Sequence, residues 1–464
     1  MVLPTDTPEP STVSTSKPDG SPWSSTGCFI DRHPWWVCGA LFFVFWIYRS
    51  QVYDGDGDQL TRMVESGLWM VHTELLSQAA FQLAYKILFP WGWDGLSVIN
   101  LVSCLAGAAA IRVLFQFNKA YVGIDPLWVL GLFGSSGFLL YANGHTEYYP
   151  LFLVTLFFYG YVGVGYLRDR FSMTAVGLAF SLAAWMHLGI LFAAPTLLIL
   201  IVLKKNWQDI GDLLLGLLLL GAAYFVKEFH PLLGFTVQGL SPSSNFIPME
   251  PDLIRNRFYT MFSWGHLADI LYAWTMRSWI FWPVVLWAAA AEGFKSILRP
   301  DRLFLLFYTL AFTFFTLTWH PDLGILQDWD LFAIEAAPCL LLVLLYLPSF
   351  LNSPFRRYAL AMAVTASFFI LFSEMVEEAQ LFRREYGAVR IELSQPLKTN
   401  VTLNGHHQTT NVPAIREGVY STKVINLQHM RVHDFYVDVA PHTTSVVALQ
   451  VGPTEGRGGA KFKY

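Results

Sequence analysis

Residues 95–115 read GLSVINLVSCLAGAAAIRVLF, and Arg112 is the one charged side chain among them. A helix needs about 20 mostly apolar residues to cross the hydrocarbon core of a bilayer, and this stretch meets that requirement. Further apolar stretches of the same character lie at 34–50, 125–142, 149–167, 172–187, 188–203, 211–227, 278–292, 303–319, 331–349 and 358–376. The sequence therefore predicts an all-α polytopic membrane protein with about eleven transmembrane helices.

The composition excludes several other classes of protein. Only 14% of the 464 residues are charged and 54% are hydrophobic, whereas soluble domains carry about 25% charged residues. Disordered chains combine low hydrophobicity with high net charge, but the net charge here is −4. Because basic residues are not in excess, the chain lacks the positive field that gathers nucleic acid, and nucleic acid is not an expected partner.

The distribution of Lys and Arg predicts the orientation of the spans. Cytoplasmic joints carry an excess of basic residues. If the tail 1–33, which we expect to be disordered, is cytoplasmic, the inner joints contain Lys119, Arg168, Arg170, Lys204, Lys205, Lys295, Arg299, Arg302, Arg356 and Arg357. The short outer joints, 144–148 and 320–330, contain neither Lys nor Arg. This alternation predicts a cytoplasmic N-terminus and a C-terminus on the outer face. We expect a bacterial inner-membrane protein whose outer face is periplasmic or extracellular; an endoplasmic-reticulum lumen is the alternative.

The spans 172–187 and 188–203 are separated only by Met186–Gly189, so a turn at this point decides the topology. A single long helix there would reverse the orientation of everything that follows. The count of eleven depends on a turn at this point.

Three regions outside the spans are expected on the outer face. Loop 50–94 has apolar positions at helical spacing over Thr61–Leu88, which predicts amphipathic helices on the membrane surface. Loop 228–277 is rich in Pro, Ser, Asn and aromatic residues. Residues 385–464 contain short alternating stretches between turn residues, which predicts a small extracytoplasmic β-rich domain after the transmembrane module 34–376.

Three carboxylates directly follow the first span, in the run Asp54-Gly55-Asp56-Gly57-Asp58. Carboxylates this close together need a divalent cation (Mg²⁺, Mn²⁺ or Ca²⁺), a raised pKa or an arginine beside them. The spacing resembles the start of an EF-hand loop with Glu65 at the last position, but Gln59 replaces the required glycine. Two interpretations remain open: a catalytic or metal-binding cluster, and a solvated turn in which Asp58 caps a helix.

Two other outer joints carry polar side chains at membrane level, where such groups are costly and indicate function. His145 and Glu147 lie two residues apart before the fourth span, where they could orient one another or share a ligand. The joint before span 331–349 contains His320, Asp322, Asp328, Trp329 and Asp330, with Glu335 one turn later. The alternative interpretation of both joints is an ordinary interfacial loop with aromatic anchors.

An anionic substrate would also need cations on this side. Arg255 and Arg257 lie among aromatic residues in loop 228–277, a combination that suits a phosphate beside an apolar chain, although lipid-headgroup contact explains it equally. Four other outer polar residues fit ordinary surface positions better than a site: His72, Glu74, His266 and Asp269. His187, in the tight joint Met186–Gly189, is a further candidate.

Taken together, the first span ending in Asp54–Asp58, the amphipathic segment after it, the many further spans and the outer C-terminal region resemble the GT-C superfamily. These are polytopic membrane glycosyltransferases that use polyprenyl-phosphate-linked sugars. The resemblance covers most of 34–376 and has one local motif. It implies that Asp54, Asp56 or Asp58 acts as a catalytic base or metal ligand. Glu147, Asp328 and Asp330 match no motif of the family and stand as catalytic candidates on the physical argument alone.

The sequence thus favours a glycosyltransferase that moves a sugar from a polyprenyl-phosphate donor to a glycan, lipid or protein acceptor. Arg255, Arg257, His145, His320, Asp322 and Trp329 would bind substrate. Two alternatives are a non-catalytic subunit of a membrane complex, which would dock through 385–464, and a transporter. The first hypothesis requires the three acidic segments to meet at one boundary between water and lipid.

Overall fold

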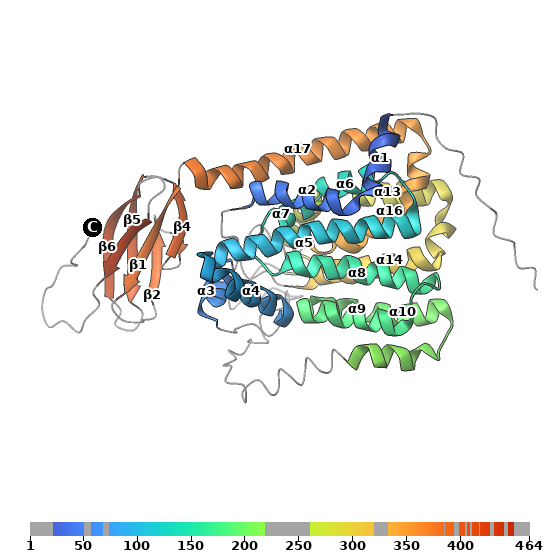
Figure 1. Ribbon diagram of the computed structural model, residues 1–464, viewed down its shortest axis with the longest axis horizontal. Coiled ribbons are helices and arrows are strands. Elements are labelled where there is room, and N and C mark those ends of the chain that lie inside the picture. The colour runs from blue at the N-terminus through green and yellow to red at the C-terminus, as the bar shows by residue number, and fades with distance from the viewer. Residues whose placement is uncertain are drawn as a thin grey trace, which may run out of the picture.

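The computed structural model describes residues 22–50, 57–67, 74–218, 260–319 and 333–384, together with the backbone of strands between 386 and 449. The described chain is mostly helical, and Figure 1 shows long helices side by side in a bundle, with the strands beyond one end. The helices are α1 (Pro22–Arg32), α2 (Pro34–Ile47), α3 (Gly57–Ser66), α4 (Leu75–Leu88), α5 (Gly95–Phe117), α6 (Pro126–Gly134), α7 (Phe138–Ala142), α8 (Tyr149–Leu167), α9 (Met173–Met186), α10 (Pro195–Lys204), α12 (Trp264–Ser278), α13 (Phe281–Glu292), α14 (Pro300–Thr318), α16 (Ala336–Leu351) and α17 (Pro354–Arg384), with short helical turns at η1 (Phe89–Trp91), η2 (Asn118–Val122), η3 (Leu188–Ala193) and η5 (Phe294–Leu298). Residues 209–218 are helical as well.

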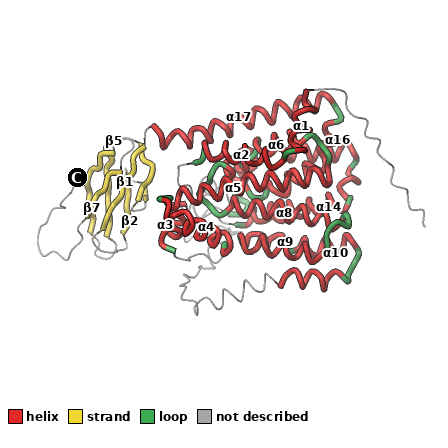
Figure 2. The backbone as a smooth tube through the Cα atoms, in the orientation of Figure 1, coloured by secondary structure: helices red, strands yellow, loops and turns green. Residues whose placement is uncertain are grey.

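Apolar helices occupy the described parts of the stretches that the sequence marks as spans; residues 219–227 of the stretch 211–227 lie outside the described residues. Among the described residues, four are long and apolar enough to cross a membrane, by length and composition alone: Gly95–Val122, Tyr149–Leu167, Pro300–Thr318 and Pro354–Val376. Shorter apolar helices lie at Pro34–Ile47, Met173–Met186, Leu188–Lys204, Phe281–Glu292 and Ala336–Leu351. Figure 2 shows that helices make up most of the described chain. The stretch 125–142 is not one helix, because turn residues at 135–137 separate α6 from α7.

A sharp turn at His187 separates α9 from η3 and α10. His187 has an extended backbone, with φ −162° and ψ 128°. Lys204, at the end of α10, donates from Nζ to the carbonyl oxygen of Tyr166 at 2.7 Å, near the end of α8. The chain therefore leaves the Tyr166 end of the bundle along α9 and returns to it along α10. The stretches 172–187 and 188–203 run in opposite directions, as the eleven-span topology requires.

Helix α1 corrects the prediction of a disordered tail through residue 33, because Pro22–Arg32 is helical. Packing explains the difference. Ile30 is buried, and a Cβ on Gly27 would lie 2.7 Å from Oδ1 of Asp125 at the start of α6. The helix therefore rests closely on the bundle. The helix is amphipathic, and the contacts at Gly27 and Ile30 hold it against the bundle.

Helix α17 leads directly into strands that form two sheets. The strands are β1 (Tyr386–Leu393), β2 (Thr399–Leu403), β3 (His406–Gln408), β4 (Asn411–Arg416), β5 (Gly418–Asn426), β6 (Arg431–Val439) and β7 (Thr444–Leu449). One sheet has the order β4-β1-β7 and the other β3-β2-β5-β6. The parallel pairing of β1 with β7 joins the first strand to the last, whereas the remaining pairs are antiparallel.

The middle of the bundle is organised around α5, which packs against α2, α7 and α8 (Figure 1). A close approach at Gly107 makes this packing specific. A Cβ there would meet the side chain of Ala142 in α7 and would lie 2.6 Å from the Ala142 Cα. Because the obstructing atoms include backbone, the two segments can approach this closely only with glycine at position 107.

We expect Gly107→Ala to lower the melting temperature of the purified protein, because inserting a methyl group into a packed core costs about 1–3 kcal/mol. Gly211→Ala is the matched control, since no atom lies within 4 Å of a Cβ at that position. Thermal unfolding in detergent, followed by tryptophan fluorescence, measures both. An equal response in the two variants would contradict the close approach of α5 and α7.

Candidate functional site

Helices α3 and α4 cover one end of the bundle, where the amphipathic segment of the first outer loop was predicted (Figure 1). Leu60, Met63 and Val64 of α3 form a buried cluster with Phe81 of α4, and Ile99 and Tyr148 complete it. The apolar faces of α3 and α4 therefore pack on the bundle. The chain that enters α3 is held close to the loop that contains Tyr148.

The loop 143–149 connects α7 to α8 and is buried over most of its length. The exposed fractions of His145, Thr146 and Glu147 are 2%, 0% and 5%. Hydrogen bonds fix its backbone: Ser103 of α5 donates to the carbonyl oxygen of His145 at 2.7 Å, and Ser50 donates its N–H to the carbonyl oxygen of Asn143, also at 2.7 Å. These bonds hold the loop at the end of α5. His145 and Glu147 are thus fixed inside the protein.

Gly57 brings the first acidic motif into contact with this loop. It is the first residue of α3, and a Cβ on it would lie 2.5 Å from Oγ1 and 3.0 Å from the carbonyl oxygen of Thr146. Thr146 lies between His145 and Glu147 in the chain. The backbone of the Asp-Gly-Asp-Gly-Asp run therefore touches the His145–Glu147 loop at Gly57, and a larger residue would push the two apart.

Most of the other predicted site residues lie outside the described part of the chain. This applies to Asp54, Asp56, Arg255, Arg257, His320, Asp322, Asp328, Trp329 and Asp330. Asp58 belongs to the first turn of α3, and only its backbone is described. Of the predicted residues, His145 and Glu147 are the ones whose burial is described. The meeting of all three acidic segments stays a prediction.

A buried carboxylate–imidazole pair lies at the same end of the bundle. Nε2 of His187 is 3.2 Å from Oε1 of Glu74, and the exposed fractions of their side chains are 12% and 7%. The N–H of Gly189 donates to Nδ1 of His187 at 2.9 Å, which leaves Nε2 as the nitrogen that carries the proton toward Glu74. The pair joins the start of α4 to the turn after α9.

This pair corrects the interpretation of Glu74 as an ordinary surface residue and gives the candidate His187 a partner. The two lie far apart in the sequence, and nothing local connects them. His187 also contacts Tyr149, with ring centroids 5.3 Å apart, and Tyr149 follows the Glu147 loop directly. The imidazole of His187 therefore belongs to the same region as the loop 143–149. In the sequence, only the position of His187 in a tight joint between two spans pointed to a role in this region.

The residues that flank the third acidic segment reach the same region. Trp319 precedes that segment and contacts Phe192 of η3, with ring centroids 6.2 Å apart. Glu335 follows it, is 2% exposed, and accepts a hydrogen bond from Thr316 of α14 at 3.1 Å. The chain therefore leaves and re-enters the described structure close to the turn that begins at His187.

These contacts gather carboxylates and imidazoles from distant parts of the chain at one end of the bundle. Carboxylates and imidazoles are the usual groups for proton transfer near neutral pH, and buried ones are held in fixed positions. Among the described residues, no group of three His, Cys, Asp or Glu side chains could hold a metal ion. The carboxylates of Asp54, Asp56 and Asp58, which the sequence predicts as metal ligands, are not among the described side chains.

Comparisons with known proteins give two structural neighbours. No family model and no curated protein matches the chain. ArnT from Cupriavidus metallidurans in the apo state is 15% identical with TM-score 0.49; the match covers 76% of this chain and 66% of the ArnT chain. ArnT from the same organism bound to undecaprenyl phosphate is 13% identical with TM-score 0.45; the match covers 74% of this chain and 63% of the ArnT chain. The matched region thus spans about two thirds of ArnT or slightly less.

Because both TM-scores are below 0.5, the likeness concerns the overall arrangement of the chain. Inferences about individual residues rest on the contacts described above.

We expect Gly57→Ala to destabilise the protein by about 1–3 kcal/mol, because the added methyl group collides with Thr146. Gly39→Ala in α2 is the control, since a Cβ there meets nothing within 4 Å. Thr146→Ala should recover part of the loss in the double variant by removing one of the two obstructing oxygens. Equal melting temperatures for Gly57→Ala and Gly39→Ala would contradict the contact.

A double-mutant cycle tests the Glu74–His187 pair. We expect Glu74→Ala and His187→Ala each to lower the melting temperature, because each leaves a buried polar partner unpaired. The double variant should lose less stability than the sum of the two single losses, because either substitution alone already removes the interaction. The coupling should reach about 0.5–3 kcal/mol. Lys86→Ala, at an exposed position of α4, is the control. Strictly additive losses would show that the two side chains do not interact.

Proposed function

We propose that this chain is a membrane glycosyltransferase of the GT-C type. It moves a sugar from a polyprenyl-phosphate-linked donor to an acceptor on the outer face of the membrane. The observation that carries the proposal is the contact of Gly57 with Thr146, because it brings the acidic motif of the first outer loop against the buried His145–Glu147 loop. The proposed donor lipid is a polyprenyl phosphate, the class to which the undecaprenyl phosphate bound in one ArnT structure belongs.

The proposed reaction exchanges one bond at the anomeric carbon of the donor sugar. The acceptor oxygen attacks C1, the bond from C1 to the phosphate oxygen breaks, and the polyprenyl phosphate departs with the bonding electrons. A carboxylate takes the proton of the acceptor hydroxyl as general base. We assign this role to Asp54, Asp56 or Asp58, with Glu147 as a further carboxylate in the same site. Positive charge near the departing phosphate lowers the barrier, and Arg255 and Arg257 are the candidates.

The three aspartates also have the chemistry of a divalent-cation site, since hard cations prefer carboxylate oxygens. A cation bound there would neutralise the charge of the phosphate group. Asp328, Asp330, His320, Asp322 and Trp329 would complete the site from the third acidic segment. Their proposed place is supported by the flanking residues Trp319 and Glu335, which lie near the turn at His187.

The proposed topology has about eleven spans, with the N-terminus in the cytoplasm and residues 385–464 as an extracytoplasmic β-rich domain. Two observations support it. The loop 143–149 and the Glu74–His187 pair lie at one end of the bundle, whereas the predicted inner residues Arg168, Lys204 and Arg302 lie at the other, where α8 and α10 end. A site at the outer end would face the periplasm of a bacterial inner membrane.

The test is transfer of a radiolabelled sugar from undecaprenyl phosphate to acceptors in membranes that contain the protein. We expect at least one of Asp54→Asn, Asp56→Asn and Asp58→Asn to reduce transfer by about 10²–10⁴-fold, the usual contribution of a general base. Glu147→Gln should also reduce it. Asp212→Asn, an exposed position beyond the end of α10, should retain full activity.

Size-exclusion profiles of the variants must match that of the wild type, so that a loss of transfer reports chemistry and not misfolding. Full activity in all three aspartate variants would remove the proposal. So would the absence of transfer by the wild type across a panel of undecaprenyl-phosphate-linked sugars.

A further inference from the structure

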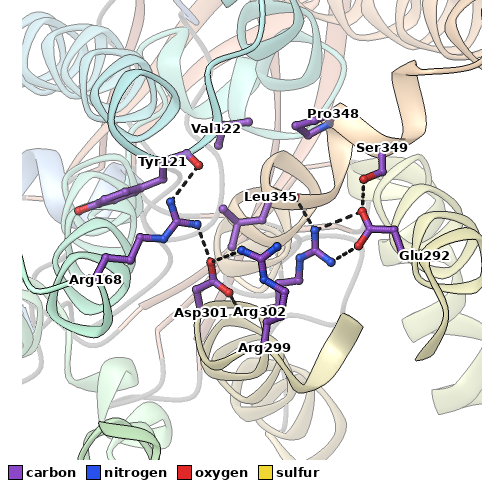
Figure 3. Close-up of a pocket in the computed structure, with 10 residues that line it drawn as sticks. All are labelled: Tyr121, Val122, Arg168, Glu292, Arg299, Asp301, Arg302, Leu345, Pro348 and Ser349. Atoms are coloured by element: carbon purple, nitrogen blue, oxygen red, sulfur yellow. Dashed lines mark hydrogen bonds and ion pairs between the residues drawn. The ribbon is translucent and has the colours of Figure 1, made fainter. Parts of the chain in front are cut away.

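A pocket of about 380 Å³ lies at the opposite end of the bundle from the candidate site. Small-molecule sites typically have volumes of about 300–1,000 Å³, so this pocket can hold a headgroup-sized molecule. Figure 3 shows its charged side chains in a row from Arg168 through Asp301, Arg299 and Arg302 to Glu292. Tyr121, Val122, Leu345 and Pro348 form an apolar wall beside that row.

The charges in the pocket do not balance, because three guanidinium groups face two carboxylates. Arg302 pairs with Glu292 through both carboxylate oxygens, and its side chain is only 6% exposed. Nη2 of Arg168 lies 2.5 Å from Oδ2 of Asp301, and Oδ1 of Asp301 accepts the N–H of Arg302 at 2.9 Å. Both carboxylates are therefore already engaged.

Arg299 carries the surplus positive charge. Its Nη2 lies 3.6 Å from Oδ2 of Asp301, beyond hydrogen-bond distance, and its side chain is 58% exposed. The other two arginines each make a further hydrogen bond to the backbone: Arg168 donates to the carbonyl oxygen of Tyr121, near the end of η2, and Arg302 donates to that of Leu345, inside α16. No hydrogen bond of this kind is described for Arg299. Its guanidinium remains able to bind an anion.

The wall of the pocket is shaped by a π-helical turn. Residues Asn118–Val122 at the end of α5 are π-helical, a rare form that often marks functional sites. The turn presents the carbonyl oxygen of Tyr121 to Arg168 and its Val122 to the pocket. The pocket therefore has a mostly polar lining, to which Val122, Leu345 and Pro348 add apolar side chains.

We propose that this pocket binds the phosphate headgroup of an anionic phospholipid of the cytoplasmic leaflet. Basic pockets between transmembrane helices on that side recognise such headgroups, and guanidinium groups match phosphate oxygens in geometry. Arg299 contacts the phosphate, and Val122, Leu345 and Pro348 contact the glycerol and the first carbons of the lipid. The proposal depends on the membrane orientation given above but not on sugar transfer.

The test is a titration of the purified full-length protein in detergent with a short-chain phosphatidylglycerol, followed by the melting temperature. We expect the lipid to raise the melting temperature of the wild type, because a molecule that binds only the folded state stabilises it. Arg299→Gln should need about tenfold more lipid for the same rise, since it loses a charge-assisted contact. Arg299→Lys should lie between the two.

Arg357→Gln is the matched control: an exposed arginine of α17, also from a predicted inner joint, that does not line the pocket. It should respond as the wild type does. Phosphatidylcholine of the same chain length should have little effect. The proposal would be overturned if phosphatidylglycerol protected Arg299→Gln as well as the wild type, or if phosphatidylcholine protected equally. Protection by inorganic phosphate at the same concentration would overturn the assignment to a lipid.

These results are independent of catalysis. Lipid-dependent stabilisation in a protein that transfers no sugar would leave the pocket assignment intact and reject only the proposed function. Sugar transfer by a protein that phosphatidylglycerol does not stabilise would reject the pocket assignment and leave the proposed function intact.

Discussion

The candidate site depends on the attachment of the loop 143–149 to the end of α5. A buried loop must satisfy its backbone polar groups within the protein, because each one left unpaired costs free energy comparable to a lost hydrogen bond. Ser103 satisfies the carbonyl oxygen of His145, and Ser50 satisfies that of Asn143. Asn100 in turn donates to the carbonyl oxygen of Ser50 at 2.8 Å. One small network therefore joins the chain after α2 to the loop that contains Glu147.

The two ends of the bundle differ in their chemistry, and the difference follows from which charges each end can pair. At one end, Glu74 and His187 pair, and Glu335 accepts a hydrogen bond from Thr316. At the other, Arg168 and Arg302 both pair with carboxylates and donate to backbone carbonyls. The carbonyl of Tyr121 lies near a helix C-terminus, where carbonyls attract cations, so Arg168 stabilises the fold there. Arg299 is the surplus cation of this arrangement, because Asp301 already pairs with Arg168.

Much of the helical framework could be predicted from the sequence, because the apolar character of each stretch is a local property. The positions of α5, α8 and α14 follow their apolar stretches closely. The sequence did not predict the order of α1, whose residues are held by contact with α6. It also did not predict the bend between α6 and α7, because apolar residues continue through it. Of the candidate site, His145 and Glu147 could be named from their place in a joint between spans, but their burial could not.

The sequence by itself determined where the chain is apolar, which joints are basic and where acidic motifs occur, since each depends on neighbouring residues only. Tertiary structure alone decided which of these segments meet. The contact of Gly57 with Thr146, the pairing of Glu74 with His187 and the shared carboxylate of Asp301 each join residues that are distant in the chain. Such pairs form because packing brings helix ends together and buried charges then need partners, and no local pattern records the outcome.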